Sequence, residues 1–235
     1  MKPVPLHMPD GTLEGLKWLA LLLMTGDHIN KYLFNGTLPL LFEVGRLALP
    51  LFVFVLTHKL ARPGALERGA YTRTMKRLAL FGALASVPFI ALGGLPWGWL
   101  PINVMGTLWL LAACAYLASK GGWGSLGIAG LLFALGGLFV EFWWPAIAFG
   151  MAVWSYCKRP TWFAAIIAIL ACAALWFING NFWALAALPL LCCATYVDLP
   201  VPRWRWVFYA FYPAHLAALW LIRIPMRKAG HLFFY

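Results

Sequence analysis

Long apolar runs alternate along the chain with short segments that contain glycine, proline or basic residues. An apolar run of about 20 residues crosses a bilayer as an α-helix, because a helix satisfies its backbone hydrogen bonds internally. The pattern predicts helices over nine runs, at 13–34, 38–60, 75–93, 101–118, 124–141, 143–156, 161–178, 182–197 and 205–224. The sequence therefore predicts an all-α fold, a polytopic integral membrane bundle of about nine transmembrane helices.

The two runs that meet near 142–145 form one broken helix in an alternative interpretation, so roughly eight to ten spans fit the pattern. Composition agrees with a lipid environment, because 63% of the residues are hydrophobic and only 11% are charged. A soluble domain of this length carries more charge. We expect one transmembrane domain over 1–235, with a short N-terminal segment, 1–12, and a short C-terminal tail, 225–235.

Basic residues crowd the connection between the second and third predicted helices. The positive-inside rule places this connection in the cytoplasm, which makes the N-terminus cytoplasmic as well. Later inner connections follow the same rule, but a tail with Arg227 and Lys228 lies outside, against it. The residues of the basic connection are Lys59, Arg62, Arg68, Arg73, Lys76 and Arg77.

This basic connection has two interpretations, and it carries much of the net charge of +11. Anionic lipid headgroups attract each basic residue by about 1 kcal/mol, so the cluster could simply anchor the protein. It could also dock a phosphate-rich cytosolic cofactor. His58, beside the cluster, is either a solvated interface residue or a cofactor contact. No aromatic-interleaved nucleic-acid motif accompanies the charge, so we expect no nucleic-acid partner.

Ionisable residues also lie inside the first two predicted helices. With a rise of about 1.5 Å per residue, His28 lies about 9 Å below the outer end of its helix, and Glu43 and Arg46 lie about 8 and 12 Å deep. Asp27 shares this layer. Each such charge disfavours insertion by roughly 2.5–3.5 kcal/mol at a helix centre, which favours a polar cavity. Alternatively, Glu43 and Arg46 neutralise each other and fasten two helices together.

His28 is either a hydrogen-bonded packing residue or a catalytic base. Asp27 and Glu43 are equal candidates for its partner, because adjacent residues on a helix point about 100° apart. Four further residues could line a cavity in this layer as substrate contacts: Asn103, Glu141, Tyr212 and His215. The histidines lack the i,i+4 pairing of a helical zinc site, and the five cysteines lie in apolar segments. We therefore predict neither a metal site nor a disulfide framework.

Three segments carry a family resemblance: 16–30 with its Gly-Asp-His, 45–52 with its Gly-Arg-Leu, and 211–216 with its Tyr-Pro-Ala-His. Together they resemble the TraX family of integral membrane pilin acetylases. Because this is a plasmid conjugation family, the resemblance also fits a TrbP-like counterpart from another plasmid type. The middle departs from the family, because Glu141-Phe142-Trp143-Trp144 stands where relatives tend to show Asp or Ser followed by Tyr-Gly.

The resemblance implies transfer of an acetyl group from acetyl-CoA to a pilin subunit, at its N-terminal amine, during conjugative pilus maturation in the bacterial inner membrane. It implies a pilin and other conjugative transfer proteins as partners, besides the bilayer. Broader membrane acyltransferases with a first-helix histidine and a nearby arginine match His28 and Arg46. The cofactor-binding residues would then be His58, Lys59, Arg62, Arg73, Lys76 and Arg77.

The expected mechanism uses His28 as general base on the pilin ammonium, oriented by Glu43 or Asp27, with Arg46 stabilising the oxyanion. An acetylated His28 intermediate is an open alternative. The acceptor could also be a side chain or another molecule, since some conjugative pilins resemble cyclic peptides. A non-enzymatic scaffold of the transfer apparatus is the second hypothesis. A transporter is less consistent, because paired Gly/Pro-broken helices in matching halves are lacking.

Overall fold

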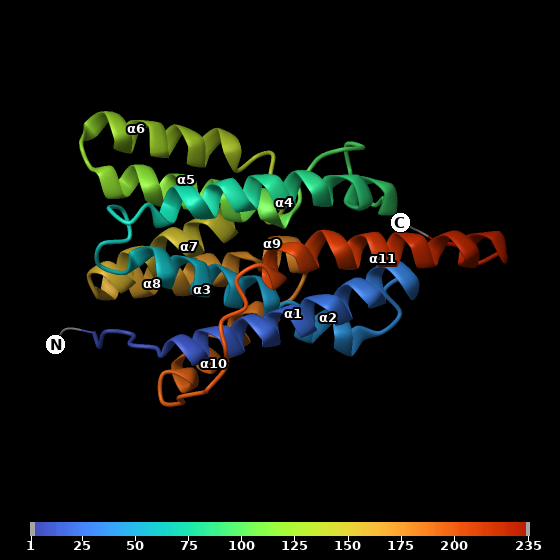
Figure 1. Cartoon of the computed structure of the whole chain (residues 1–235), viewed down its shortest axis with the longest axis horizontal. Coiled ribbons are helices and arrows are strands. Elements are labelled where there is room, and N and C mark those ends of the chain that lie inside the picture. Colours follow the sequence, from blue (N-terminus) through green and yellow to red (C-terminus); the bar gives the residue numbers. More distant parts are fainter. Residues whose placement is uncertain (1–2, 234–235) are drawn as a thin grey trace.

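A computed structural model describes residues 3–233, and helices make up most of this part of the chain (Figure 1). Residues 1–2 and 234–235, the extreme ends of the two expected terminal segments, lie outside the described residues. The helices are α1 (Asp10–Leu33), α2 (Pro39–Gly45), α3 (Ala48–Ala61), α4 (Ala70–Leu92), α5 (Val104–Lys120), α6 (Trp123–Leu131), α7 (Trp143–Lys158), α8 (Trp162–Ala174), α9 (Trp176–Asn179), α10 (Ala187–Ala194) and α11 (Val207–Lys228). A π-helical turn η1 (Leu132–Gly136) follows α6, and a 3-10 turn η2 (Trp183–Ala186) precedes α10.

Every apolar run predicted from the sequence becomes helical, which confirms the all-α class of a helical membrane protein. The run at 38–60 bends into α2 and α3, and the run at 161–178 divides into α8 and α9. The only strand-like pairing among the described residues is an isolated bridge between Ile102 and Val140. Periodicity and length therefore located the elements, while their breaks depend on tertiary contacts.

The expected count of about nine transmembrane helices is wrong. Within residues 3–233, four helices are both long and apolar enough to cross a membrane: Pro39–Ala61, Ala70–Leu92, Trp162–Asn179 and Val207–Lys228. Helix α1 has 24 residues but carries acidic and basic groups along its length. Other apolar helices are shorter, and the 17 residues of α5 extend only about 26 Å, against a hydrocarbon core of about 30 Å.

The helices run roughly along the long axis of the molecule, so the connections gather at two ends (Figure 1). At one end the N-terminal segment meets the basic connection, because Arg62 Nη2 lies 2.7 Å from Asp10 Oδ1. The Tyr156 hydroxyl also donates to the Val4 carbonyl at 2.7 Å. We call this the basic end, and by the positive-inside rule we expect it to face the cytoplasm.

The opposite end joins the tip of α1, the end of α4 and the C-terminal segment. The Arg223 guanidinium donates to the Leu92 carbonyl at 2.5 Å. The Asn35 side-chain amide donates to the Leu232 carbonyl at 2.8 Å. The predicted grouping of the connections into two alternating ends is therefore present, with the C-terminal segment opposite the basic end.

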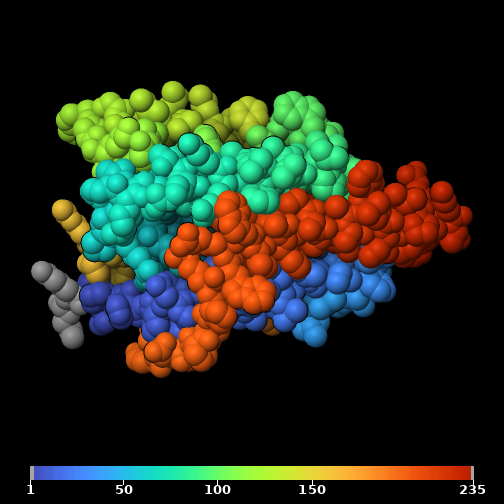
Figure 2. Space-filling view, in the orientation of Figure 1, coloured from blue at the N-terminus to red at the C-terminus, as the bar shows by residue number. Residues whose placement is uncertain are grey.

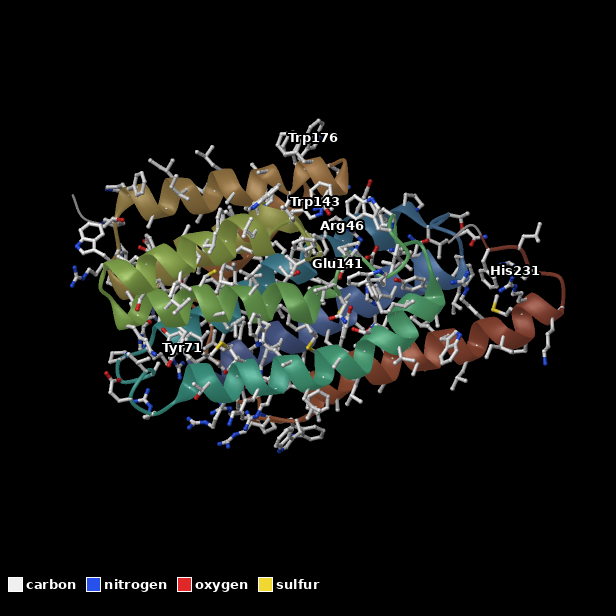
Figure 3. The ribbon with its side chains drawn as sticks, turned by 90° about the horizontal axis from the view of Figure 1, so that it is seen from above. Arg46, Tyr71, Glu141, Trp143, Trp176 and His231 are labelled. Atoms are coloured by element: carbon white, nitrogen blue, oxygen red, sulfur yellow. The ribbon has the colours of Figure 1, made fainter. Side chains whose placement is uncertain are left out.

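A buried tyrosine joins four helices near the basic end. The Tyr71 hydroxyl donates to the Leu60 carbonyl at 2.7 Å and accepts from Trp154 Nε1 at 2.9 Å and from Ser119 Oγ at 2.8 Å. These groups come from α4, α3, α7 and α5, and Tyr71 lies toward one end of the bundle in Figure 3. Because Tyr71 is only 1% exposed, water cannot reach its hydroxyl, and these protein groups provide its hydrogen bonds instead.

The largest apolar core lies among α3, α5, α7 and α8, and its fully buried members include Leu51, Leu111, Ile147 and Phe149. A second cluster joins α4, α5 and α11, and α4 and α11 pack side by side in Figure 2. Helices α5 and α7 approach closely at Gly150. A Cβ atom at Gly150 would lie 2.4 Å from Cδ2 of Leu111.

The connection between α10 and α11 crosses the first turns of α1 (Figure 2). A Cβ at Gly11 would lie 1.7 Å from the Leu199 carbonyl oxygen, so only glycine fits there. The Thr12 hydroxyl donates to the Val197 carbonyl at 2.5 Å, and the Leu199 amide donates to the Thr12 hydroxyl at 3.3 Å. This crossing fixes where the segment before α11 reaches the basic end.

We predict that Gly150→Ala lowers the thermal unfolding midpoint of the protein in detergent. The added methyl group meets buried Leu111, and overpacking of this kind costs about 1–3 kcal/mol. Gly124→Ala in α6 is the control, because a Cβ there meets nothing within 4 Å and alanine favours helices by about 1 kcal/mol over glycine. Equal midpoints for the two variants would contradict the α5–α7 packing.

Candidate functional site

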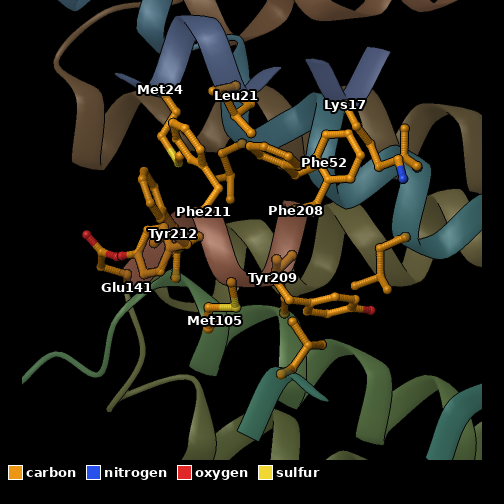
Figure 4. Close-up of a pocket in the computed structure, with 18 of the residues that line it drawn as sticks. Lys17, Leu21, Met24, Phe52, Met105, Glu141, Phe208, Tyr209, Phe211 and Tyr212 are labelled. Carbon is orange, nitrogen blue, oxygen red and sulfur yellow. The ribbon is translucent and has the colours of Figure 1, made fainter. Parts of the chain in front are cut away.

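One cavity of about 650 Å³ runs between α1, α3, α4, α5 and α11. Figure 4 shows Lys17 on one side of it and Glu141 on the other, with the rings of Phe208, Phe211 and Tyr212 between them. The cavity therefore has a cationic end, an apolar middle and a second polar region deeper in the bundle. Such a polarity suits a ligand that is charged at one end only.

The cationic wall lies at the basic end of the molecule, and its residues are Lys17, Lys59, Arg62, Arg68, Arg73, Arg77, Arg203 and Arg205. The sequence predicted four of them, Lys59, Arg62, Arg73 and Arg77, as cofactor contacts. It missed Arg203 and Arg205, which arrive through the α10–α11 connection. Nothing in their local sequence signals this placement, because it depends on the crossing over α1.

Two predicted cofactor contacts lie elsewhere. His58 Nε2 lies 3.2 Å from the Leu6 carbonyl and lines a separate hollow formed with the N-terminal segment. Lys76 is exposed on α4 and does not line the cavity. Residues of the basic connection therefore differ in orientation: some side chains face the cavity and others do not.

Two cavity lysines share one buried carboxylate that sequence reasoning did not single out. Glu14 is 1% exposed, and its oxygens lie 2.5 Å from Lys17 Nζ and 2.6 Å from Lys59 Nζ. Lys17 Nζ also lies 4.0 Å above the centre of the Phe208 ring. The spacing of Glu14 and Lys17, i and i+3 in an apolar run, is the signal that could have revealed this cluster.

At the deeper region, His28 lines the cavity and contacts a second histidine. His28 Nδ1 lies 2.7 Å from His215 Nε2, and the two rings are nearly parallel at 9°. His215 is 7% exposed, lies outside the cavity lining, and has its Nδ1 3.0 Å from the Phe211 carbonyl. The expected carboxylate partner of His28 is therefore replaced by an imidazole, and His215 does not line the cavity in which a substrate contact was expected.

Asp27 forms an ion pair with Arg46 across the α1–α2 contact, and each side chain is 13% exposed. The same guanidinium donates from Nε to the Phe42 carbonyl at 3.0 Å and from Nη1 to Asn179 Oδ1 at 3.4 Å. These bonds bring α1, α2 and α9 together. Asp27 therefore serves Arg46 rather than His28.

Glu43 takes no part in this arrangement. It is half-buried, lies outside the cavity lining, and forms no ion pair with any residue in 3–233. The alternative interpretation, in which Glu43 neutralises Arg46, does not hold, since Asp27 pairs with Arg46 instead. Gly45 makes the real pairing sterically feasible, because a Cβ there would lie 2.5 Å from Cβ of Asp27.

Glu141 lines the cavity near Arg46, in the middle of the bundle (Figure 3). Its amide donates to the Ile102 carbonyl at 2.9 Å, which anchors the backbone. The next two residues, Phe142 and Trp143, have φ values of 63° and 45°, a region that costs non-glycine residues of order 1–3 kcal/mol. This strained turn begins α7 and holds Glu141 at the cavity wall.

The two remaining predicted contacts differ in kind. Tyr212 lines the cavity beside Glu141 (Figure 4). Asn103 does not line it: Oδ1 accepts from the Met105 amide at 3.1 Å as the N-cap of α5, and Nδ2 donates to the Gly82 carbonyl at 2.9 Å. Asn103 is thus a structural residue that ties α5 to α4.

Asn30 and Tyr32 also line the cavity, and sequence reasoning assigned them no role. Asn30 is 1% exposed; its Oδ1 accepts from the Leu38 amide at 2.8 Å, while Nδ2 has no partner among the described residues. Tyr32 is 1% exposed and its ring meets that of His28 edge-on at 5.7 Å. The amide of Asn30 therefore has a donor that is available to a ligand carbonyl in the cavity.

This arrangement combines an imidazole, a fixed guanidinium and a carboxylate in one region, with the cationic wall at the other end of the same cavity. Within residues 3–233, no group of three or more His, Cys, Asp or Glu side chains is placed to hold a metal ion. The chemistry best suited to these groups is proton transfer with stabilisation of a developing negative charge.

We predict that Asp27→Asn and Arg46→Gln each destabilise the protein by about 3 kcal/mol, because each leaves one charge of a mostly buried pair uncompensated. The double variant should lose less than the sum of the two, as measured by unfolding in detergent. Glu43→Gln is the control and should change little. Additive single effects, or an equal loss in the Glu43 variant, would show that Arg46 is not paired with Asp27.

Comparison with known proteins identifies the family of the chain. A comparison with curated proteins and one with solved structures each give no match. The family model described as TraX protein matches residues 12–223, which include both histidines of the cavity region and almost the whole cationic wall and bundle. The chain belongs to the TraX family.

Proposed function

We propose that the protein is a membrane-embedded acetyltransferase that moves an acetyl group from acetyl-CoA to an amine of a pilin subunit during conjugative transfer. The observation that carries this proposal is the single cavity that joins the cationic wall to His28 and Arg46. Membership of the TraX family supports the link to pilin and conjugation. The N-terminal amine of the pilin is the acceptor that best fits the resemblance.

The polarity of the cavity supports acetyl-CoA as donor. This cofactor carries its phosphates at one end and its thioester at the other, separated by a long uncharged arm. Arginine and lysine bind phosphate through strong charge-assisted hydrogen bonds, and Arg73, Arg77, Arg203 and Arg205 supply such groups at the basic end. The apolar middle, with Leu21, Met24, Phe52 and Met105, suits the uncharged arm.

The reaction then needs a base for the acceptor ammonium. His28 takes one proton, and the free amine attacks the thioester carbonyl carbon, so that a C–N bond forms and the C–S bond breaks. The departing thiolate takes this proton back from His28, and the second proton that the acceptor nitrogen loses on forming the amide is released to solvent. Direct attack leaves His28 unmodified, whereas an acetylated His28 would be a second route to the same products.

Arg46 is suited to the negative charge that develops on the carbonyl oxygen. A guanidinium has five N–H donors, and three are used by Asp27, Phe42 and Asn179. Two donors remain on a group whose position is fixed before the reaction, which is the condition for effective oxyanion stabilisation. Glu141 is suited to attract the acceptor ammonium, because its carboxylate lines the same region.

His28→Gln should reduce pilin acetylation by about 10²–10⁴-fold, because glutamine keeps the bulk but cannot take the proton. Mass spectrometry of pilin from cells with equal membrane levels of each variant measures the effect. His231→Gln is the control, since His231 is exposed at the far end of the molecule (Figure 3). Unaltered acetylation in the His28 variant contradicts the catalytic role and favours the scaffold hypothesis.

Binding of coenzyme A to the purified protein tests the cationic wall. We expect Arg73→Gln and Arg205→Gln each to weaken binding about tenfold, since a hydrogen bond to a charged group contributes about 1.5–3 kcal/mol. Pantetheine, which lacks phosphates, should bind equally weakly to all variants. Lys76→Gln is the control from the same basic connection, and a loss as large as in the arginine variants would overturn the assignment.

A further inference from the structure

We propose that His215 is a positioning residue that fixes the tautomer of His28, so that Nε2 of His28 is the unprotonated base at the cavity. The catalytic use of this base depends on the proposed function, but the tautomer itself does not. The proposal follows from four atoms in sequence: the Phe211 carbonyl oxygen, the two ring nitrogens of His215, and Nδ1 of His28.

The first step concerns Nδ1 of His215, which lies 3.0 Å from the Phe211 carbonyl oxygen. A carbonyl oxygen only accepts hydrogen bonds, so this nitrogen carries a proton. An uncharged imidazole holds one N–H, which makes Nε2 of His215 an acceptor. The backbone of α11 therefore sets the first tautomer.

The second step concerns the 2.7 Å contact between His215 Nε2 and His28 Nδ1. Because Nε2 accepts, Nδ1 of His28 must donate, and two protonated nitrogens could not approach this closely. The lone pair of uncharged His28 then lies on Nε2. This atom is on the ring edge away from His215, and His28 lines the cavity whereas His215 does not.

The surroundings keep the His28 ring in this orientation. Tyr32 meets it edge-on at 5.7 Å and Tyr212 lies at 6.4 Å, so a ring flip would displace buried aromatic side chains. Phe211 stacks on the far side of His215 at 5.1 Å. Pro213 lies between these α11 residues and provides no backbone N–H of its own. The two rings are thus a preformed unit held by α1 and α11.

The pair also explains where positive charge goes during transfer. When Nε2 of His28 takes a proton from the acceptor ammonium, His28 becomes an imidazolium whose Nδ1–H still points at His215. That proton can shift to His215 Nε2, so two rings share one charge, and the Phe211 carbonyl accepts from the second ring. The reverse shift returns that proton to Nδ1 of His28, and Nε2 then gives up its own proton to the departing thiolate.

Nitrogen-15 NMR of histidine-labelled protein in detergent tests the tautomer directly, with His28→Gln identifying the His28 signals. In the wild type we expect Nδ1 of His28 protonated and Nε2 unprotonated. His215→Phe removes the acceptor and should let the Nε2–H tautomer appear. His215→Gln retains an acceptor oxygen and should preserve the wild-type tautomer.

In acetyl-transfer assays, His215→Phe should lower kcat about 10–100-fold, as losses of an orienting partner do, with little change in KM for acetyl-CoA. His215→Gln should restore part of kcat. A wild-type His28 with its proton on Nε2, or a tautomer unchanged by His215→Phe, would overturn the proposal whatever the activity. Failure of the proposed function alone would give a different result: His28→Gln would leave pilin acetylation unaltered, while the wild-type protein would still show the expected His28 tautomer.

Discussion

The ion pair between Asp27 and Arg46 is the interaction on which the cavity region depends. In a helical membrane protein, a charge away from water needs a partner, and this pair joins α1 to α2. Its formation requires the absence of a side chain at Gly45, and it leaves two guanidinium donors available. Because Asp27 and His28 are adjacent, the same contact directs the histidine away from α2 and toward α11.

Sequence patterns were sufficient to find the helices and the polar layer. Apolar length and breaks at glycine, proline and basic residues located the elements, and the charges in the first two helices marked His28, Asp27 and Arg46. What the pattern could not provide was the partner of each group. His215 is 187 residues away from His28, and Arg203 and Arg205 reach the cavity only because a connection crosses α1 at Gly11.

One prediction from the sequence, the helix count, and one alternative interpretation, the pairing of Glu43 with Arg46, fail for physical reasons. Counting apolar runs as spans assumed that each run becomes one long straight helix, whereas η1, η2 and the bends at α2–α3 and α8–α9 shorten or divide them. Pairing Glu43 with Arg46 assumed that neighbours on one helix interact first. Asp27 on the facing helix pairs with Arg46 instead. A charge pair buried between helices has a stronger interaction energy than an exposed i,i+3 pair.

The two histidines come from opposite ends of the polypeptide, since α1 is made first and α11 last. During synthesis His28 is made long before His215. Arg203 and Arg205, which precede α11, are made only shortly before His215. A chain released before its last helix therefore has neither the oriented imidazole nor a complete cationic wall. In the proposed mechanism, the cavity therefore becomes competent for acetyl transfer only when α11 has docked against α1.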